Sequence, residues 1–187
     1  MAGEFWTSAK SEPKRNFRFL VMLGGKVIWW AKTVTTPSYD VAEVEHNFLD
    51  NKFYFPGRVS WSTVSMTLVD PVSPDAVQMT NDYVIGASLP VPNYKIKNEA
   101  SGTNEPKTVS KAKAVAALGT VNIQVLNAEG VAIEQWDLNN AFIQSAKYGD
   151  LAYSNDDLRT IELTIRYDWA TCVINDGTTS TPQFEPS

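Results

Sequence analysis

The chain is organised around residues 41–71, which read VAEVEHNFLDNKFYFPGRVSWSTVSMTLVDP. β-Branched and aromatic residues crowd both halves of this stretch, and such residues favour extended chain. Asp50-Asn51 and Pro56-Gly57 are turn signals, because Asp and Asn tolerate positive φ and Pro followed by Gly suits a type II turn. The proline at the end closes the stretch, since proline cannot donate to a sheet ladder. The stretch therefore predicts a long hairpin.

The apolar residues of its second half change phase. They stand first on odd and then on even positions, in the order Val59, Trp61, Val64, Met66 and Leu68. A strand alternates with period two, so a single face cannot hold both sets. Either a β-bulge lies near Ser62-Thr63, or Val59 and Trp61 leave their own sheet and meet another chain. We expect residues 41–69 to form β-structure between subunits.

Composition indicates one folded domain. The chain has 187 residues, 43% of them apolar and 11% aromatic, which excludes a disordered chain. Residues 1–36 carry six Lys or Arg against two acids, residues 37–100 carry four against eight, and residues 101–187 carry six against eleven. An acidic body argues against gripping nucleic acid, which needs a basic surface.

The single cysteine and the apolar runs limit the class of protein further. Cys172 has no partner for an intrachain disulfide, and we expect it to be a small core residue. The first 13 residues lack the apolar region of a secretion signal, and no apolar run approaches a membrane span. We expect a soluble, intracellular chain with no membrane anchor.

The remaining pattern predicts a mainly β fold, an antiparallel β-sandwich or barrel with one flanking α-helix and the long inter-subunit hairpin. We expect an N-terminal arm over 1–15, in which Phe5 and Trp6 dock on a neighbour or on the chain's own body. One domain follows over 16–174, with an insert around 93–118, and a flexible tail covers 175–187. The expected strands are 17–23, 26–36 buried on both sides, 120–125, 131–138, a weaker segment at 142–153, and 160–169.

One or two helices are expected. Ser73 suits an N-cap, Pro74 the first helical position and Gly86 the C-cap of a helix over 73–86. Residues 110–118 are read either as a short Ala-rich helix between Ser110 and Gly119 or as a strand, and we favour the helix.

No catalytic, cofactor or metal site is expected, so the sequence does not predict an enzyme. The only histidine, His46, has no evident partner for a triad or a metal site. Glu43 and Glu45 fall on one strand face, which suits a solvated or pore-lining face better than acid–base chemistry. The six tryptophans could stack on sugars, which makes a carbohydrate-binding module the competing class, but core or subunit packing is the stronger interpretation.

Three motifs resemble those of tail tube proteins from contractile-tailed (T4-like) bacteriophages. The first runs from Asn47 to Asp70, with Tyr54, Pro56-Gly57-Arg58, Trp61 and the run TLVDP before a helix. The second is VAIEQWDLNNAF at 131–142, and the third is 156–169, which ends in TIRYDW. In order, the motifs span most of residues 15–170.

The resemblance implies a structural virion subunit. Such proteins form six-membered rings with one continuous inner barrel, and the rings stack into a tube that conducts genomic DNA into the host. The implied partners are further copies of the chain, the tail sheath, baseplate and terminator proteins, and the tape measure protein and transient DNA in the lumen. The implied location is the virion tail, after assembly in the host cytoplasm. A tube subunit of a type VI secretion or pyocin-like machine is the nearest alternative.

Both sets of candidate site residues follow from this interpretation. The expected interface residues are Asp50, Phe53, Phe55, Arg58, Val59 and Trp61. The expected lumen residues are Glu43 and Glu45 on the hairpin and Glu162 and Asp168 on the wet face of the last strand. A carboxylate-lined wall would give passing phosphates no binding minimum, so we expect a polar, net negative lumen.

Overall fold

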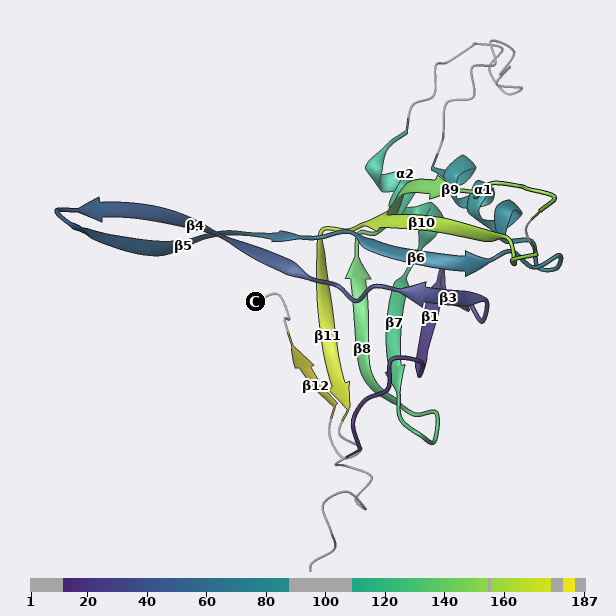
Figure 1. Ribbon diagram of the computed structural model, residues 1–187, viewed down its shortest axis with the longest axis horizontal. Coiled ribbons are helices and arrows are strands. Elements are labelled where there is room, and N and C mark those ends of the chain that lie inside the picture. The colour runs from purple at the N-terminus through teal and green to yellow at the C-terminus, as the bar shows by residue number, and fades with distance from the viewer. Residues whose placement is uncertain (1–11, 88–108, 155, 176–179, 184–187) are drawn as a thin grey trace, which may run out of the picture.

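The computed structural model describes residues 12–87, 109–154, 156–175 and 180–183. Its strands form two antiparallel sheets and a separate hairpin (Figure 1). The large sheet has the order β12-β11-β8-β7-β1-β2, with β1 (Phe19–Leu23), β2 (Lys26–Val27), β7 (Val121–Leu126), β8 (Ala132–Asn139), β11 (Trp169–Asn175) and β12 (Ser180–Gln183). The small sheet has the order β3-β6-β10-β9, with β3 (Ala31–Val34), β6 (Val64–Val69), β9 (Phe142–Lys147) and β10 (Thr160–Arg166). The hairpin consists of β4 (Tyr39–Phe48) and β5 (Asn51–Trp61).

The two sheets pack face to face as a sandwich, which confirms the predicted fold class. In Figure 1 the strands of the large sheet run steeply across those of the small sheet, as in orthogonal packing. The core lies between them and is built from alternate positions of each strand. Its fully buried members include Val21, Leu23, Val121 and Ile123 from the large sheet, and Val64, Met66, Leu68, Ile161, Leu163 and Ile165 from the small sheet.

Cys172 is buried on β11, as expected of a small core residue. Burial also raises the pKa of its thiol. The expected strand 26–36 is instead two short strands, and it is not buried on both sides. Trp30 is 8% exposed, whereas Trp29 is 70% exposed on the other face of the chain.

The last predicted strand also needs a correction. Its apolar residues are buried as far as Tyr167, but β10 ends at Arg166 and the chain crosses to the large sheet, where Trp169 begins β11. Asp168 therefore lies in the connection between β10 and β11, and not on β10 with Glu162. Further towards the C-terminus, β12 pairs with β11 in the segment expected to be a loose tail.

Both helices flank the sandwich near β9 (Figure 1). Helix α1 (Ala76–Gly86) starts later than predicted, because Asp75 is the N-cap and accepts from the Gln78 N–H at 2.9 Å. Helix α2 (Lys111–Leu118) confirms the favoured interpretation of 110–118. Ser110 is its N-cap, and Gly119 has the positive φ of 68° that suits a glycine C-cap.

An aromatic cluster fixes the base of the hairpin to the sandwich. The Trp61 ring centroid lies 5.3 Å from that of Tyr39 and 5.9 Å from that of Tyr167. Tyr167 is 2% exposed, and burial raises the pKa of its hydroxyl. Tilted and edge-on aromatic pairs at these distances add to the free energy of burial. The cluster therefore fixes the position of the hairpin base on the sandwich.

Replacing Trp61 with Ala should lower the free energy of unfolding by about 3 kcal/mol, because the partly buried ring packs on both tyrosines. Urea denaturation measures this. Trp29→Ala is the matched control and should change stability by about 0.5 kcal/mol or less, because its ring is mostly exposed. Equal effects of the two changes would contradict the anchoring role.

Candidate assembly surface

The hairpin projects from the sandwich as an isolated two-stranded ribbon (Figure 1). In the described chain its two strands pair only with each other, and every residue of both is exposed except Trp61. Many of these residues are large and apolar: Tyr39, Val41, Val44, Phe48, Phe53, Tyr54, Phe55 and Val59. A two-stranded ribbon is marginally stable alone, and a contiguous exposed apolar surface marks an interaction site. The hairpin is therefore the candidate functional site.

Strand register divides the outer part of the hairpin into two unlike faces. Directly paired residues share a face, and the face alternates along each strand. One face, called the apolar face below, carries the pairs Val44–Phe55, His46–Phe53 and Phe48–Asn51. The other, called the polar face, carries the pairs Glu43–Pro56, Glu45–Tyr54 and Asn47–Lys52. The apolar face of the hairpin is therefore suited to packing against another surface, and the polar face is suited to contact with solvent.

An ion pair adds order to the polar face. Lys52 Nζ lies 3.0 Å from Glu45 Oε1, and both side chains are largely exposed. Such a pair contributes little stability, about 0.5 kcal/mol. Its main effect is to neutralise the charge of Glu45. Glu43 is then the carboxylate of the polar face without an ion-pair partner among the described residues.

The turn and the bulge of the hairpin differ from the sequence prediction. The tip is Leu49-Asp50, with Leu49 at φ 54°, whereas Asn51 already pairs with Phe48. Pro56-Gly57 lies inside β5 instead of forming a turn, next to a register shift opposite Val41–Glu43. A Cβ at Gly57 would lie 2.9 Å from the Ala42 carbonyl oxygen, so only glycine fits this close approach.

The change of strand after Trp61 explains the phase change of the apolar residues. The bulge lies near Gly57, not near Ser62-Thr63, where the chain instead passes from β5 to β6. Residues 64–69 are therefore not inter-subunit structure, because β6 pairs with β3 and β10 of its own chain. Within residues 41–69, only the hairpin lacks a further strand partner among the described residues.

The structure brings five of the six predicted interface residues together on the exposed ribbon. Asp50 is at the tip, Phe53 and Phe55 are on the apolar face, Arg58 is beside the bulge, and Val59 is 55% exposed near the base. Trp61 instead packs against the core of its own chain. Sequence reasoning missed Val44 and Phe48, which complete the apolar face, because only the register shows that they lie beside Phe53 and Phe55.

The four predicted lumen residues do not form one cluster. Glu43 and Glu45 share the polar face of the hairpin, whereas Glu162 is on β10, with its carboxylate 3.8 Å from Lys147 Nζ. Asp168 accepts a hydrogen bond from Lys111 at 2.6 Å and another from Asn140 at 2.9 Å. The Lys111 hydrogen bond, followed by that from Asn140, holds the pKa of Asp168 below its ordinary 3.8. This geometry indicates that Asp168 fastens α2 to the sheet corner.

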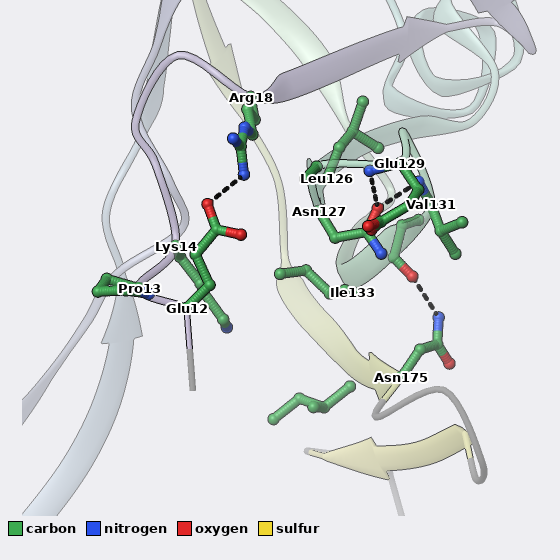
Figure 2. A pocket seen from close by; sticks show the side chains of 13 residues that line it. Glu12, Pro13, Lys14, Arg18, Leu126, Asn127, Glu129, Val131, Ile133 and Asn175 are labelled. Atoms are coloured by element: carbon green, nitrogen blue, oxygen red, sulfur yellow. Dashed lines mark hydrogen bonds and ion pairs between the residues drawn. The ribbon is translucent and has the colours of Figure 1, made fainter. Parts of the chain in front are cut away.

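A shallow apolar hollow of about 350 Å³ lies beside the turn between β7 and β8 (Figure 2). The first described residues form one wall, where Glu12 pairs with Arg18 at 3.0 Å. Asn127 orders the turn opposite, because its side-chain oxygen accepts from the N–H groups of Glu129 and Val131. Phe5 and Trp6, expected to dock on a neighbour or on the body, lie outside the described residues.

No metal-binding constellation supports catalytic chemistry in the described chain. No group of three or more His, Cys, Asp or Glu residues in this part of the protein could hold a metal ion. His46 lies on the hairpin opposite Phe53. None of the helices described is long and apolar enough to cross a membrane.

Solved structures with the same fold come from contractile injection particles. A chain of the anti-feeding prophage tube-terminating cap has a TM-score of 0.62 at 15% identity, covering 88% of this chain and 93% of that one. A chain of the sheath–tube complex of PVC, an extracellular contractile injection system, has a TM-score of 0.62 at 17% identity, covering 93% and 100%. A chain of the anti-feeding prophage baseplate has a TM-score of 0.59 at 17% identity, covering 86% and 95%.

No protein-family model and no curated protein sequence matches the chain. The structural likenesses establish the fold, which is that of components of contractile injection particles. This is the fold that the resemblance to tail tube proteins predicted.

Replacing Asp168 with Asn should destabilise the protein at pH 7 by about 1 kcal/mol or less, because the carboxylate is partly exposed. An aspartate whose pKa falls on folding stabilises the fold above its ordinary pKa. Its contribution is therefore lost as the pH falls below 3.8. Urea denaturation over a pH series should show the difference from wild type shrinking in that range.

Asp156→Asn is the control, because Asp156 is exposed and makes no ion pair within the described residues. It should leave stability unchanged across the series. A loss at Asp168 that is equal at every pH would contradict the electrostatic role.

Proposed function

We propose that this protein is the tube subunit of a contractile injection particle, a structural protein and not an enzyme. The observation that carries the proposal is the hairpin, which has one apolar face and no further strand partner in the described chain. Its fold is shared with chains of a sheath–tube complex and a tube-terminating cap, which supports this class. Sheath, baseplate and terminator proteins are the partners that follow.

The small sheet is the proposed wall of the tube. In the described chain β3 pairs only with β6, and β9 only with β10, so neither outer edge has a strand partner. Open edges are a hazard unless another chain pairs with them, and closing a ring of copies removes them. The face away from the core is polar, with Ser65, Thr67, Ser145, Lys147, Glu162, Thr164 and Arg166.

The energetics favour a closed ring over a simple pair. Burying the exposed half of Val44, Phe48, Phe53 and Phe55 contributes about 1 kcal/mol each, or about 4 kcal/mol per hairpin. Association costs roughly 4–15 kcal/mol in lost freedom, so one hairpin contact does not hold two copies together firmly. In a ring every copy gives and receives a contact, as in the six-membered rings that the resemblance implies. Assembly should therefore be cooperative.

The proposed cargo is the genomic DNA of a contractile-tailed phage. On the polar face of the small sheet, Lys147 and Arg166 outweigh Glu162. The repulsion of phosphate that we expected of the wall therefore rests on the hairpin, chiefly on Glu43, because Glu45 is paired with Lys52. An injection particle that carries protein is the second candidate, supported by the likeness to an extracellular contractile injection system.

Electron microscopy of the purified, concentrated protein tests the proposal. Rings or tubes with an axial hole are expected. A dispersed monomer at high concentration would contradict it, and glycan binding by that monomer would favour the carbohydrate-binding module.

Replacing Phe53 and Phe55 with Ser should abolish rings and tubes while leaving the subunit folded, because both side chains are exposed in the isolated chain. Sedimentation velocity and electron microscopy measure the loss. Tyr54→Ser is the matched control. Tyr54 stands between the two phenylalanines with a similar exposed fraction, 57%, but on the polar face, so this variant should assemble. Assembly of the double variant would contradict the role of the apolar face.

Replacing Glu43 and Glu45 with Lys should preserve tubes but make them bind DNA, because a basic lumen releases counterions from each phosphate it meets. Retention of short duplex DNA by pelleted tubes measures the change, and added salt should reverse it. The variant with Gln at both positions should retain little. If wild-type tubes bind DNA as tightly as the Lys variant, the two glutamates do not face the cargo.

A further inference from the structure

The hollow shown in Figure 2 has an apolar floor that is partly open to solvent. The floor consists of Leu126, Ala128, Val131, Ala132, Ile133 and Ile174. Val131 is 57% exposed and Ile174 is 41% exposed. A concave apolar surface with a few polar groups around it is the usual form of a binding site. The floor is therefore suited to cover by large apolar side chains.

Hydrogen bonds fix the shape of the hollow. The Asn127 side-chain oxygen accepts from the N–H of Glu129 at 3.0 Å and from that of Val131 at 2.8 Å, which orders the turn between β7 and β8. Asn175 Nδ2 donates to the Ala132 carbonyl at 3.2 Å and joins β11 to β8. A site that is already ordered loses little further freedom when it binds, so even a small apolar contact is sufficient.

Two ion pairs hold the first described residues along the opposite wall. Glu12 Oε1 lies 3.0 Å from Arg18 Nη1. Lys14 pairs with Glu134, whose side chain is 17% exposed and also accepts from Trp136 Nε1 at 2.6 Å. Glu12 itself lines the hollow. The chain that precedes Glu12 is therefore attached at the edge of the apolar floor.

The eleven residues before Glu12 read MAGEFWTSAKS and lie outside the described residues. Phe5 and Trp6 are their two aromatic residues. Trp6 precedes Glu12 by six positions, a reach of at most about 20 Å for extended chain. Each aromatic side chain buries about 150–250 Å² when it packs, which suits a hollow of about 350 Å³. The pair has the reach and the size to cover the floor.

We propose that Phe5 and Trp6 dock in the hollow of their own chain, so that the N-terminal arm covers the turn between β7 and β8. The short connection to Glu12 gives the pair a local concentration on the order of millimolar, so a segment from another chain must bind more tightly to displace it. The inference does not rest on the proposed function. In Figure 1 the β7–β8 turn lies at the end of the large sheet away from the small sheet, so docking leaves the hairpin and the small sheet free.

Cross-linking in the full chain tests the proposal. Thr7→Cys and Glu129→Cys are combined in one chain, because Thr7 follows the aromatic pair and Glu129 is exposed beside the hollow. Cys172 is buried and serves as the silent background. An equal mixture of isotope-labelled and unlabelled protein is treated with a short bifunctional maleimide, and mass spectrometry separates links within a chain from links between chains. Links within a chain should dominate.

The matched control for position combines Thr7→Cys with Leu151→Cys. Leu151 is 80% exposed, but it lies on the connection between β9 and β10. This pair should give few links of either kind.

Two further variants separate docking from mere attachment. Replacing Phe5 and Trp6 with Ser in the Thr7→Cys, Glu129→Cys chain should lower the yield of links within a chain at least about fivefold, because the apolar burial is lost. Ile174→Ser should lower the yield in the same direction from the side of the hollow. Val27→Ser is its control, since Val27 is 45% exposed on β2, and it should leave the yield unchanged. Circular dichroism verifies that each variant is folded.

Three results would overturn the inference. Links mainly between chains would show that the hollow receives the arm of a second copy. An unchanged yield after replacement of Phe5 and Trp6 would show that attachment alone brings the arm near Glu129. Equal yields with Glu129→Cys and Leu151→Cys would show that the arm has no fixed docking site.

Discussion

The central feature of the structure is a long hairpin whose apolar face is exposed, because no other described part of the chain covers it. The aromatic cluster at Trp61 fixes the base of the hairpin, but the outer apolar face has no sheet beneath it in the described chain. Phe53 and Phe55 are half-exposed side by side, which is typical of a surface that a partner covers. The rest of the molecule supplies the rigid body from which the ribbon projects.

The small sheet of the sandwich is the part of this body that we propose as the tube wall. The small sheet turns one face to the core and the other to water, and it keeps its two edges open. Asp168 with Lys111, and Arg159 with Asp70, fasten the helices and connections around it. A sheet with these properties can be repeated around a channel, because each copy contributes a polar strip and offers edges to its neighbours.

Much of the fold could be predicted from the sequence, because alternation in β6 and β10 and the turn chemistry at Asn127–Gly130 are local signals. The corner at Asp168 could not, since it depends on how distant segments meet. The helix cap at Asp75 is a local contact with Gln78, but Ser73 offers the same capping chemistry two residues earlier, so the sequence alone did not decide between them. The phase change around Trp61 drew attention to the exposed hairpin, which we propose as the assembly surface, but its cause differed from the expected bulge. It arises from the change of strand after Trp61, whereas the bulge of the hairpin lies at Gly57, and periodicity alone locates neither.

Amide hydrogen exchange, compared between dilute subunits and assembled material, tests the central claim most directly. In dilute subunits the hairpin amides should exchange far faster than those of β6 and β10, because the ribbon has no covering layer. Assembly should slow exchange of residues 39–61 to the range of the small sheet and slow the outer amides of β3 as well. Fast exchange of the hairpin in assembled material would contradict the account.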